Sequence, residues 1–282
     1  MNKKIIFVAD FFSNEITGGG ELNNDEFIAL VKKKGYEITP VKSSLLTIDI
    51  IKSSIDCHYI FGNFLALSPS VYEYILVSNL KYSIYEHDHK YLITRDPSKY
   101  ENHIAPEEHL INTLFYEKAV AIFCQSKLHK ETVQKNLKLD TIHNLSGNLW
   151  SIESLSLLRK NSSKQKKKAI GIWNSANPIK NTSKAVAYCK IKNLPYELLG
   201  PSSYNEFLDA LGKNDRFLFF PETMETLCRV VVEARMMNVK TITNGHLGAT
   251  SEEWFSLKGE DLIDCMESKR ETIPTYILET IQ

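Results

Sequence analysis

Residues Phe219 to Gly245 read FFPETMETLCRVVVEARMMNVKTITNG and contain two glutamates, Glu225 and Glu233, with seven residues between them. The apolar run before Pro221 predicts a strand, and the periodicity from about Arg229 predicts a helix. Glu225 then lies in the loop after the strand, and Glu233 lies about one turn inside the helix. Because valines and alanine flank Glu233, its carboxylate is costly to bury unless it is hydrogen-bonded or paired.

A bound nucleotide would satisfy this requirement. Ribose hydroxyls can bond to the carboxylate of Glu233, and the first N–H groups of the helix have no intrahelical partner and favour an anion. The structural alternative is an ion pair between Arg229 and Glu233, four residues apart on one helix face. Arginine before glutamate is the poorer orientation for that pair, so the pattern favours a ligand.

The two glutamates resemble the E-x7-E element of GT-B glycosyltransferases, and especially of the retaining glycosyltransferase family 4. The resemblance implies that Glu225 faces the donor sugar, that Glu233 binds the ribose, and that Thr223 in the same loop contacts the donor. The family usually has a Gly-rich turn after the first glutamate, whereas this chain has Thr226-Leu227-Cys228. Arg229 is expected to compensate as a phosphate ligand.

A second match lies upstream, in GIWNSANPIKNTSKAVAYC, residues 171–189. The pattern predicts a strand, a polar loop that begins at Asn174, and a helix. Family members carry a basic residue at the end of this loop, so the resemblance implies that Lys180 contacts the donor diphosphate and that Asn174 binds the donor. The alternative is a solvated lysine before a helix.

The glycine-rich TGGGELN, residues 17–23, follows the first predicted strand. Its glycines let the backbone approach a ligand and leave N–H groups available. The spacing is not that of a dinucleotide fingerprint, and a flexible turn is the alternative. The resemblance implies that Gly19 and Gly20 face the donor.

The segment YEHDHKYLITRDP, residues 85–97, follows another predicted strand. The resemblance implies a catalytic role for His87 near the reacting sugar. Asp88 is expected to orient an acceptor hydroxyl, and His89, Lys90 and Arg95 are candidate acceptor contacts. Two alternatives are a metal site formed by the histidines with Asp88, which lacks further ligands of clear spacing, and a helix N-cap by Asp88.

Composition sets limits on function. The chain has 282 residues, equal numbers of basic and acidic residues, and a pI near 7.1, so no global charge attracts nucleic acid or an anionic membrane. The five cysteines are scattered, as in a reduced, cytoplasmic protein. No D-x-D, G-x-S-x-G or Walker motif occurs, and no apolar stretch is long enough to cross a membrane.

Strands alternate with helices along the whole chain, which predicts an α/β protein with mainly parallel sheets. The expected architecture is GT-B, with two Rossmann-like domains facing each other across a cleft. Residues 1–150 form the acceptor-side domain, 151–168 a linker, 169–270 the nucleotide-sugar-binding domain, and 271–282 a helix that packs back on the first domain. A separate helix is expected at 107–118.

The implied reaction transfers a sugar from a nucleoside-diphosphate sugar, a UDP- or GDP-sugar, to an acceptor hydroxyl, with retention of configuration and without metal or cofactor. The acceptor is left open between a glycan, a lipid-linked sugar and a modified DNA base. The rivals are a viral-type DNA-base glycosyltransferase, an epimerase or phosphorylase, and a non-catalytic nucleotide-sugar-binding protein.

Overall fold

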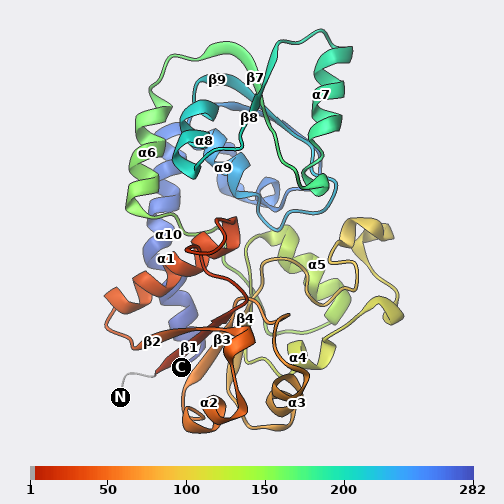
Figure 1. The fold of residues 1–282 in the computed structure, drawn as a ribbon, viewed down its shortest axis with the longest axis vertical. Helices are drawn as coiled ribbons and strands as arrows, with labels where there is room; N and C mark the ends of the chain where they lie inside the picture. The colour runs from red at the N-terminus through yellow and green to blue at the C-terminus, as the bar shows by residue number, and fades with distance from the viewer. Residues whose placement is uncertain (1–3) are drawn as a thin grey trace. The chain divides into compact units, whose positions relative to one another are not determined.

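The computed structural model describes residues 4–282, which divide into two compact units (Figure 1). Unit 1 comprises the chain up to Leu149 together with Lys269–Gln282, and unit 2 comprises Trp150–Ser268. Each unit is built on a sheet whose strands are all parallel. Parallel strands require crossover connections, and helices supply them in both units.

The sheet of unit 1 has six strands in the order β2-β1-β3-β4-β5-β6. Its strands are β1 (Ile5–Ala9), β2 (Ile38–Lys42), β3 (His58–Phe61), β4 (Tyr82–Tyr85), β5 (Ile122–Cys124) and β6 (Ile142–Asn144). Its helices are α1 (Gly19–Lys33), α2 (Ile48–Ser53), α3 (Pro69–Val77), α4 (Thr113–Glu117), α5 (Lys127–Leu137) and the last part of α10 (Gly259–Thr280), with 3-10 turns η1 (Ser43–Leu45), η2 (Pro97–Lys99), η3 (Glu101–His103) and η4 (Glu107–His109).

Both faces of this sheet are buried, and successive residues of a strand enter opposite cores. In β1, Ile5 and Phe7 belong to a core with α1 and α10, whereas Ile6 and Val8 belong to a core with α2 and α3. The last part of α10 contributes Ile273, Ile277 and Leu278 to the first of these cores, and Ile281 joins them just beyond the helix. The inner strands β1, β3, β4 and β5 are therefore buried along their whole length, whereas the edge strands β2 and β6 are partly exposed.

The sheet of unit 2 has four strands in the order β10-β9-β7-β8. Its strands are β7 (Lys167–Trp173), β8 (Tyr196–Leu199), β9 (Asn214–Phe219) and β10 (Lys240–Thr243). Its helices are α6 (Ile152–Ser162), α7 (Thr182–Ile191), α8 (Tyr204–Leu211), α9 (Arg229–Met236) and the first part of α10, with 3-10 turns η5 (Pro178–Lys180), η6 (Gly248–Ser251) and η7 (Glu253–Ser256).

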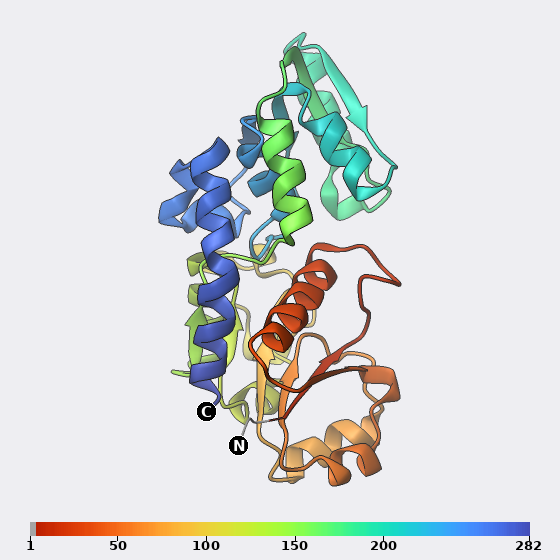
Figure 2. The same ribbon diagram turned by 90° about the vertical axis from the view of Figure 1, so that its left-hand side faces the viewer.

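The predicted linker, residues 151–168, differs from the structure. It contains α6 and the beginning of β7, and α6 lies beside the first part of α10 (Figure 1 and Figure 2). Ser151 caps α6, and Leu155 and Leu158, three residues apart, are fully buried in the unit 2 core. The prediction of a linker gave weight to the many lysines and serines of this segment and overlooked these two leucines.

Two other predicted helices also differ. Residues 107–118 form η4 and the short α4 rather than one helix, since Asn112 adopts a left-handed conformation between them. The helix expected at 271–282 begins twelve residues earlier, at Gly259, and is continuous to Thr280. Both departures concern where an element begins, which local sequence determines poorly.

Leu158→Ala tests the structural role of α6. We expect it to destabilise unit 2 by about 2–5 kcal/mol, because it removes a fully buried side chain from a packed core. Ile152→Ala in the same helix is the control, since Ile152 is 46% exposed. Urea denaturation followed by tryptophan fluorescence measures this, because Trp150, Trp173 and Trp254 all lie in unit 2. Equal effects of the two substitutions would contradict a packed α6.

Candidate functional site

In unit 2, the sheet has its topological switch point between β7 and β9. The chain runs from β7 to β8 on one side and then crosses to β9 on the other. Ligands of open α/β sheets bind outside the carboxyl ends of the strands at such a point. Backbone and side-chain bonds tie the loops together there: Glu222 N–H donates to Ile179 O at 2.8 Å, and Asn244 Nδ2 donates to Pro221 O at 2.8 Å.

Glu225 and Lys180 meet at this edge. The backbone of Glu225 is held by the loop after β10, since its N–H donates to His246 O and its carbonyl accepts from Gly248 N–H, both at 2.8 Å. Its Oε1 lies 2.6 Å from Lys180 Nζ, which also lies 5.6 Å from the centre of the Trp173 ring. The structure thus brings together two residues that the sequence had assigned to the donor.

Lys180 is a partly buried cation. Burial alone would lower its pKa, but the charge of Glu225 and the hydrogen bond to it outweigh burial, and the pKa is raised. The side chain is only 20% exposed, so the alternative of a solvated lysine is wrong. Lys180 therefore carries a positive charge at the switch point of the sheet, where an anionic group can pair with it.

Glu233 lies in α9 with its carboxylate almost fully buried. Three donors converge on its Oε1: Arg229 Nε at 2.9 Å, Trp150 Nε1 at 2.9 Å and Tyr204 OH at 2.6 Å. The Arg229 guanidinium also stacks on the Trp150 ring, 4.4 Å from its centre. Burial and the charge of Glu233 raise the pKa of Tyr204, so its hydroxyl stays protonated and donates.

The ion pair between Arg229 and Glu233, which was the structural alternative, does form. Arg229 is turned toward Glu233 and Trp150, with a side chain only 8% exposed, and its phosphate role stays a prediction. The ribose role of Glu233 stays a prediction. The turn without glycine is accommodated at Cys228, which adopts a positive φ of 77° of the kind glycine favours.

The remaining residues assigned to the donor lie in the same loops. Asn174 follows β7, is exposed, and donates through Nδ2 to Gly200 O at 3.4 Å. Thr223 is half-buried in the loop between β9 and α9. Their roles at the donor stay predictions.

In unit 1, His87 follows β4 and lies against the glycine-rich first turn of α1. Its ring stacks on Tyr85 with centroids 4.8 Å apart. A Cβ built on Gly20 would lie 3.6 Å from His87 Cγ, whereas Gly19 is exposed at the start of the helix. The N-cap of α1, Gly18, offers no side-chain cap to the first N–H groups. The structure therefore brings Gly20 and His87 together.

Two buried amides hold the His87 ring. Nε2 lies 2.7 Å from Asn24 Oδ1, and Nδ1 is hydrogen-bonded to Gln125 Nε2. Burial, with the positive charge of Lys90 as a second cause, lowers the pKa of His87 to about 3. The ring is therefore neutral near pH 7.

A charged network lies beneath the loop after β4. The Glu86 carboxylate accepts from the N–H of His87 at 3.0 Å, from the N–H of Asp88 at 2.9 Å, and from Lys90 Nζ at 2.8 Å. Burial alone would raise its pKa, but the charge of Lys90 and hydrogen bonds outweigh burial and lower it to about 2. Tyr116 also donates to the second carboxylate oxygen.

This network corrects several predictions. His89 and Lys90 are fully buried, so their assignment to the acceptor is wrong. Asp88 pairs through Oδ1 with Lys90 at 2.7 Å and through Oδ2 with Arg95. Its acceptor role stays a prediction. No helix begins directly after Asp88, since the next helical turn in the described chain is η2 at Pro97, so the N-cap alternative is wrong.

The histidines that the metal alternative would need have other partners. Among residues 4–282, no three His, Cys, Asp or Glu side chains are arranged to hold a metal ion. His87 instead bonds to amides, and His89 bonds through Nδ1 to Tyr91 OH at 3.1 Å.

Sequence reasoning missed the residues that hold the predicted ones in place. Trp150 and Tyr204 approach Glu233 from distant segments, and Asn24 and Gln125 approach His87. Asn24 adjoins the glycine-rich turn, which was a usable signal. The others carry no motif, because the fold alone brings them to their partners.

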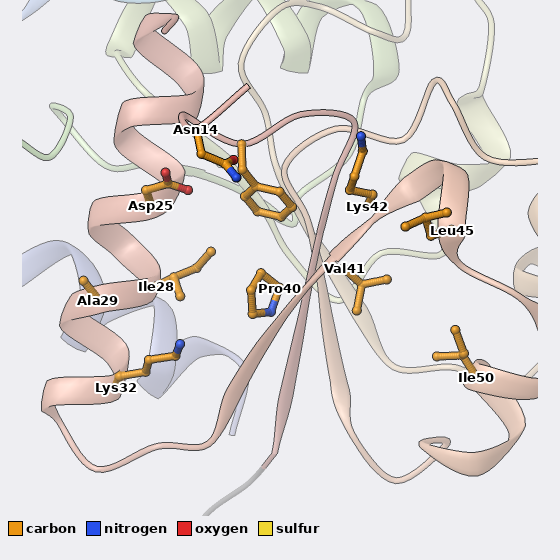
Figure 3. Close-up of a pocket in the computed structure, with 11 residues that line it drawn as sticks. Asn14, Asp25, Ile28, Ala29, Lys32, Pro40, Val41, Lys42, Leu45 and Ile50 are labelled. Atoms are coloured by element: carbon orange, nitrogen blue, oxygen red, sulfur yellow. The ribbon is translucent and has the colours of Figure 1, made fainter. Parts of the chain in front are cut away.

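A separate pocket of about 650 Å³ lies between α1 and the edge strand β2 (Figure 3). Its walls include Ile28, Pro40, Val41 and Leu45, with Asp25 and Lys42 at its sides. None of the site residues predicted from the sequence lines this pocket.

Lys90→Met tests the buried network. Removing Lys90 leaves the buried Glu86 charge without its main partner, so we expect about 3–5 kcal/mol of destabilisation near pH 7. In the wild type, the folded pKa of Glu86 lies below its usual 4.5, so its stabilisation is present above that value and is lost as the pH falls toward 2. In the variant the pKa of Glu86 is raised, so its carboxyl becomes neutral as the pH falls. The difference in unfolding free energy between variant and wild type is therefore smaller by about pH 4.

The measurement is urea equilibration at each pH, followed by a short deuterium pulse at one common pH and mass spectrometry of peptides from unit 1. Lys99→Met, at an exposed lysine of the same segment, is the control. A destabilisation independent of pH would show that Glu86 does not carry the effect.

Within residues 4–282, no helix combines the length and apolar character that a membrane crossing needs. No family model and no curated protein sequence matches the chain. Solved structures do match it.

HepE from Anabaena, solved with UDP-glucose, matches with a TM-score of 0.55 and 13% identity over 98% of this chain and 91% of that chain. A glycosyltransferase from Rickettsia africae ESF-5 matches with a TM-score of 0.50 and 13% identity, over 99% and 93% of the two chains. A UDP-forming α,α-trehalose-phosphate synthase from Burkholderia xenovorans gives 0.51 and 7%, over 100% and 95%.

At these identities the likeness concerns the fold. Two parallel sheets with crossover helices, and solved neighbours of GT-B type that match nearly the whole chain, agree with the α/β architecture that the sequence predicted. The chain therefore has the GT-B fold.

Proposed function

We propose that this chain is a glycosyltransferase that transfers a sugar from a nucleoside-diphosphate sugar to an acceptor hydroxyl. The observation that carries the proposal is the pairing of Lys180 with Glu225 at the switch point of the unit 2 sheet, with the buried Glu233 in the helix that follows. In such a donor the diphosphate lies between the ribose and the sugar, and the proposal assigns Lys180 to the diphosphate, Glu225 to the sugar and Glu233 to the ribose. HepE, which has the same fold, was solved with UDP-glucose.

In this proposal, Lys180 exchanges Glu225 for the diphosphate when the donor binds. Glu225 is then released toward the sugar hydroxyls, to which a carboxylate bonds well. Stabilising the departing diphosphate lowers the barrier, since the charge on the leaving group grows in the transition state. Thr223 and Asn174, in the loops after β9 and β7, are proposed to contact the donor as well.

Glu233 is proposed as the ribose ligand. Three donors on Oε1 hold its carboxylate in one orientation without a ligand present. Such preorganisation reduces the entropy lost on binding. Arg229 is proposed to assist at the phosphates only after it leaves Glu233.

Unit 1 is proposed to bind the acceptor near His87. Transfer with retention of configuration, as in family 4, and a reaction without metal or cofactor belong to this proposal. A cytoplasmic location is also proposed, because the buried cysteines Cys57, Cys124, Cys189 and Cys228 form no disulfide among the described residues. The donor base, uracil or guanine, and the acceptor class are to be determined by titration and by product analysis.

Lys180→Met tests the diphosphate role. We expect it to weaken binding of UDP or GDP, whichever binds, by about 1–3 kcal/mol and to leave the matching nucleoside unaffected, because the lost contact is a charged one to phosphate. Lys184→Met, at an exposed lysine of α7, is the control. Calorimetric titration measures the binding of both ligands. Equal weakening of nucleoside and nucleoside-diphosphate binding would rule out a phosphate contact by Lys180.

Glu233→Gln tests the ribose role and gives a different pattern. We expect nucleoside and nucleoside diphosphate to be weakened alike, by about 1–3 kcal/mol, since both contain the ribose. Tryptophan fluorescence during urea denaturation checks that unit 2 remains folded after the ion pair with Arg229 is lost. An unchanged dissociation constant in a folded variant would end this assignment.

His87→Ala tests the link from unit 1 to turnover. We expect nucleotide binding to stay within about twofold and sugar transfer, followed by mass spectrometry of the products, to fall by about 100-fold, since a misplaced reactant costs this much. Turnover equal to that of the wild type would reject a role for His87. Donor binding without any turnover in the wild type would favour the non-catalytic alternative.

A further inference from the structure

The side-chain amide of Gln125 has a defined orientation. Gln125 follows β5 and is 4% exposed. Its Nε2 donates to the backbone carbonyl of Glu86 at 3.3 Å. A carbonyl oxygen only accepts, so the amide end that faces it must be the NH₂ group. A main-chain group thus identifies which end of the Gln125 amide points toward His87.

The same NH₂ group contacts His87 Nδ1. Because Gln125 donates, Nδ1 must accept and carries no proton. The proton of the neutral ring then resides on Nε2, which lies 2.7 Å from Asn24 Oδ1. Every donor in this series meets an acceptor, from Gln125 through His87 to Asn24.

Steric and charged neighbours keep the ring in place. Tyr85 stacks on one face, and the first turn of α1 approaches at Gly20. Burial lowers the pKa of the His87 ring, and among the charged groups near it Lys90 also lowers that pKa whereas Glu86 raises it. The buried His129 lies behind Gln125, whose backbone N–H donates to its Nδ1 at 3.2 Å.

We propose that Gln125 and Asn24 are positioning residues that lock His87 in the neutral Nε2–H tautomer, so that His87 acts in the reaction without giving or taking a proton. This inference rests on the proposed function for its catalytic part. Both ring nitrogens are bonded within unit 1, which is unlike a general base that must present a nitrogen to its substrate. The acceptor proton is therefore taken not by His87 but by the departing diphosphate, whose oxygen gains negative charge as its bond to the sugar breaks.

The tautomer can be observed without any assay of activity. Two-bond ¹H–¹⁵N correlation spectra of the full chain distinguish the two ring nitrogens, and His87→Asn identifies the signals by their loss. We expect the Nε2–H tautomer with no titration between about pH 5 and pH 8. The Nδ1–H tautomer, or a titration in that interval, would overturn the lock. Because the tautomer is observed in the wild-type chain, poor folding of a variant does not affect the result.

Two variants change one partner each. Gln125→Glu replaces the donor by a carboxylate, which requires a proton on Nδ1, so we expect the tautomer to switch or the ring to become charged. Asn24→Asp keeps an acceptor opposite Nε2, so we expect the Nε2–H tautomer to be retained. The spectra of both variants report folding and tautomer together.

Kinetics then separate positioning from simple structural support. We expect Gln125→Glu to lower kcat by about tenfold or more with the nucleotide dissociation constant within about twofold, and Asn24→Asp to lower it much less. A switched tautomer with unchanged kcat would overturn the positioning role. If the wild type transfers no sugar, the proposed function fails, whereas the spectra still decide whether the lock exists.

Discussion

The buried charge of Glu233 is the constraint around which unit 2 is organised. A carboxylate removed from water has to be paired and hydrogen-bonded, and Arg229, Trp150 and Tyr204 all donate to one of its oxygens. These partners come from the loop before α6, from α8 and from α9 itself, so one charge fixes three elements. A helix that only packed against the core would carry an apolar residue there at less cost.

Unit 1 meets the same constraint at Glu86, directly after β4. Lys90 and two backbone N–H groups satisfy its carboxylate, and this fixes the turn from which His87 projects. In each unit, then, a buried glutamate supports the segment that carries residues proposed to bind a ligand. Such networks are costly to break, since a lost partner leaves the other charge buried.

The sequence was sufficient for the fold class and for the loops at the strand ends, because apolar runs and helical spacing are local signals. It paired Lys180 with Glu225 in function, and the structure places them in contact. It failed at α6, where two buried leucines lie among lysines and serines. It also missed Trp150 and Gln125, whose partners lie far along the chain and whose positions depend on tertiary packing alone.

The most direct test of the donor site in unit 2 is calorimetric titration of the full chain with UDP-, GDP-, ADP- and dTDP-sugars, without added metal. The account predicts that one donor, a UDP- or GDP-sugar, binds with a dissociation constant of about 1–100 μM, which corresponds to roughly 5–8 kcal/mol. A folded protein that binds none of the four would contradict it, and would leave a GT-B fold in which the paired glutamates serve structure alone.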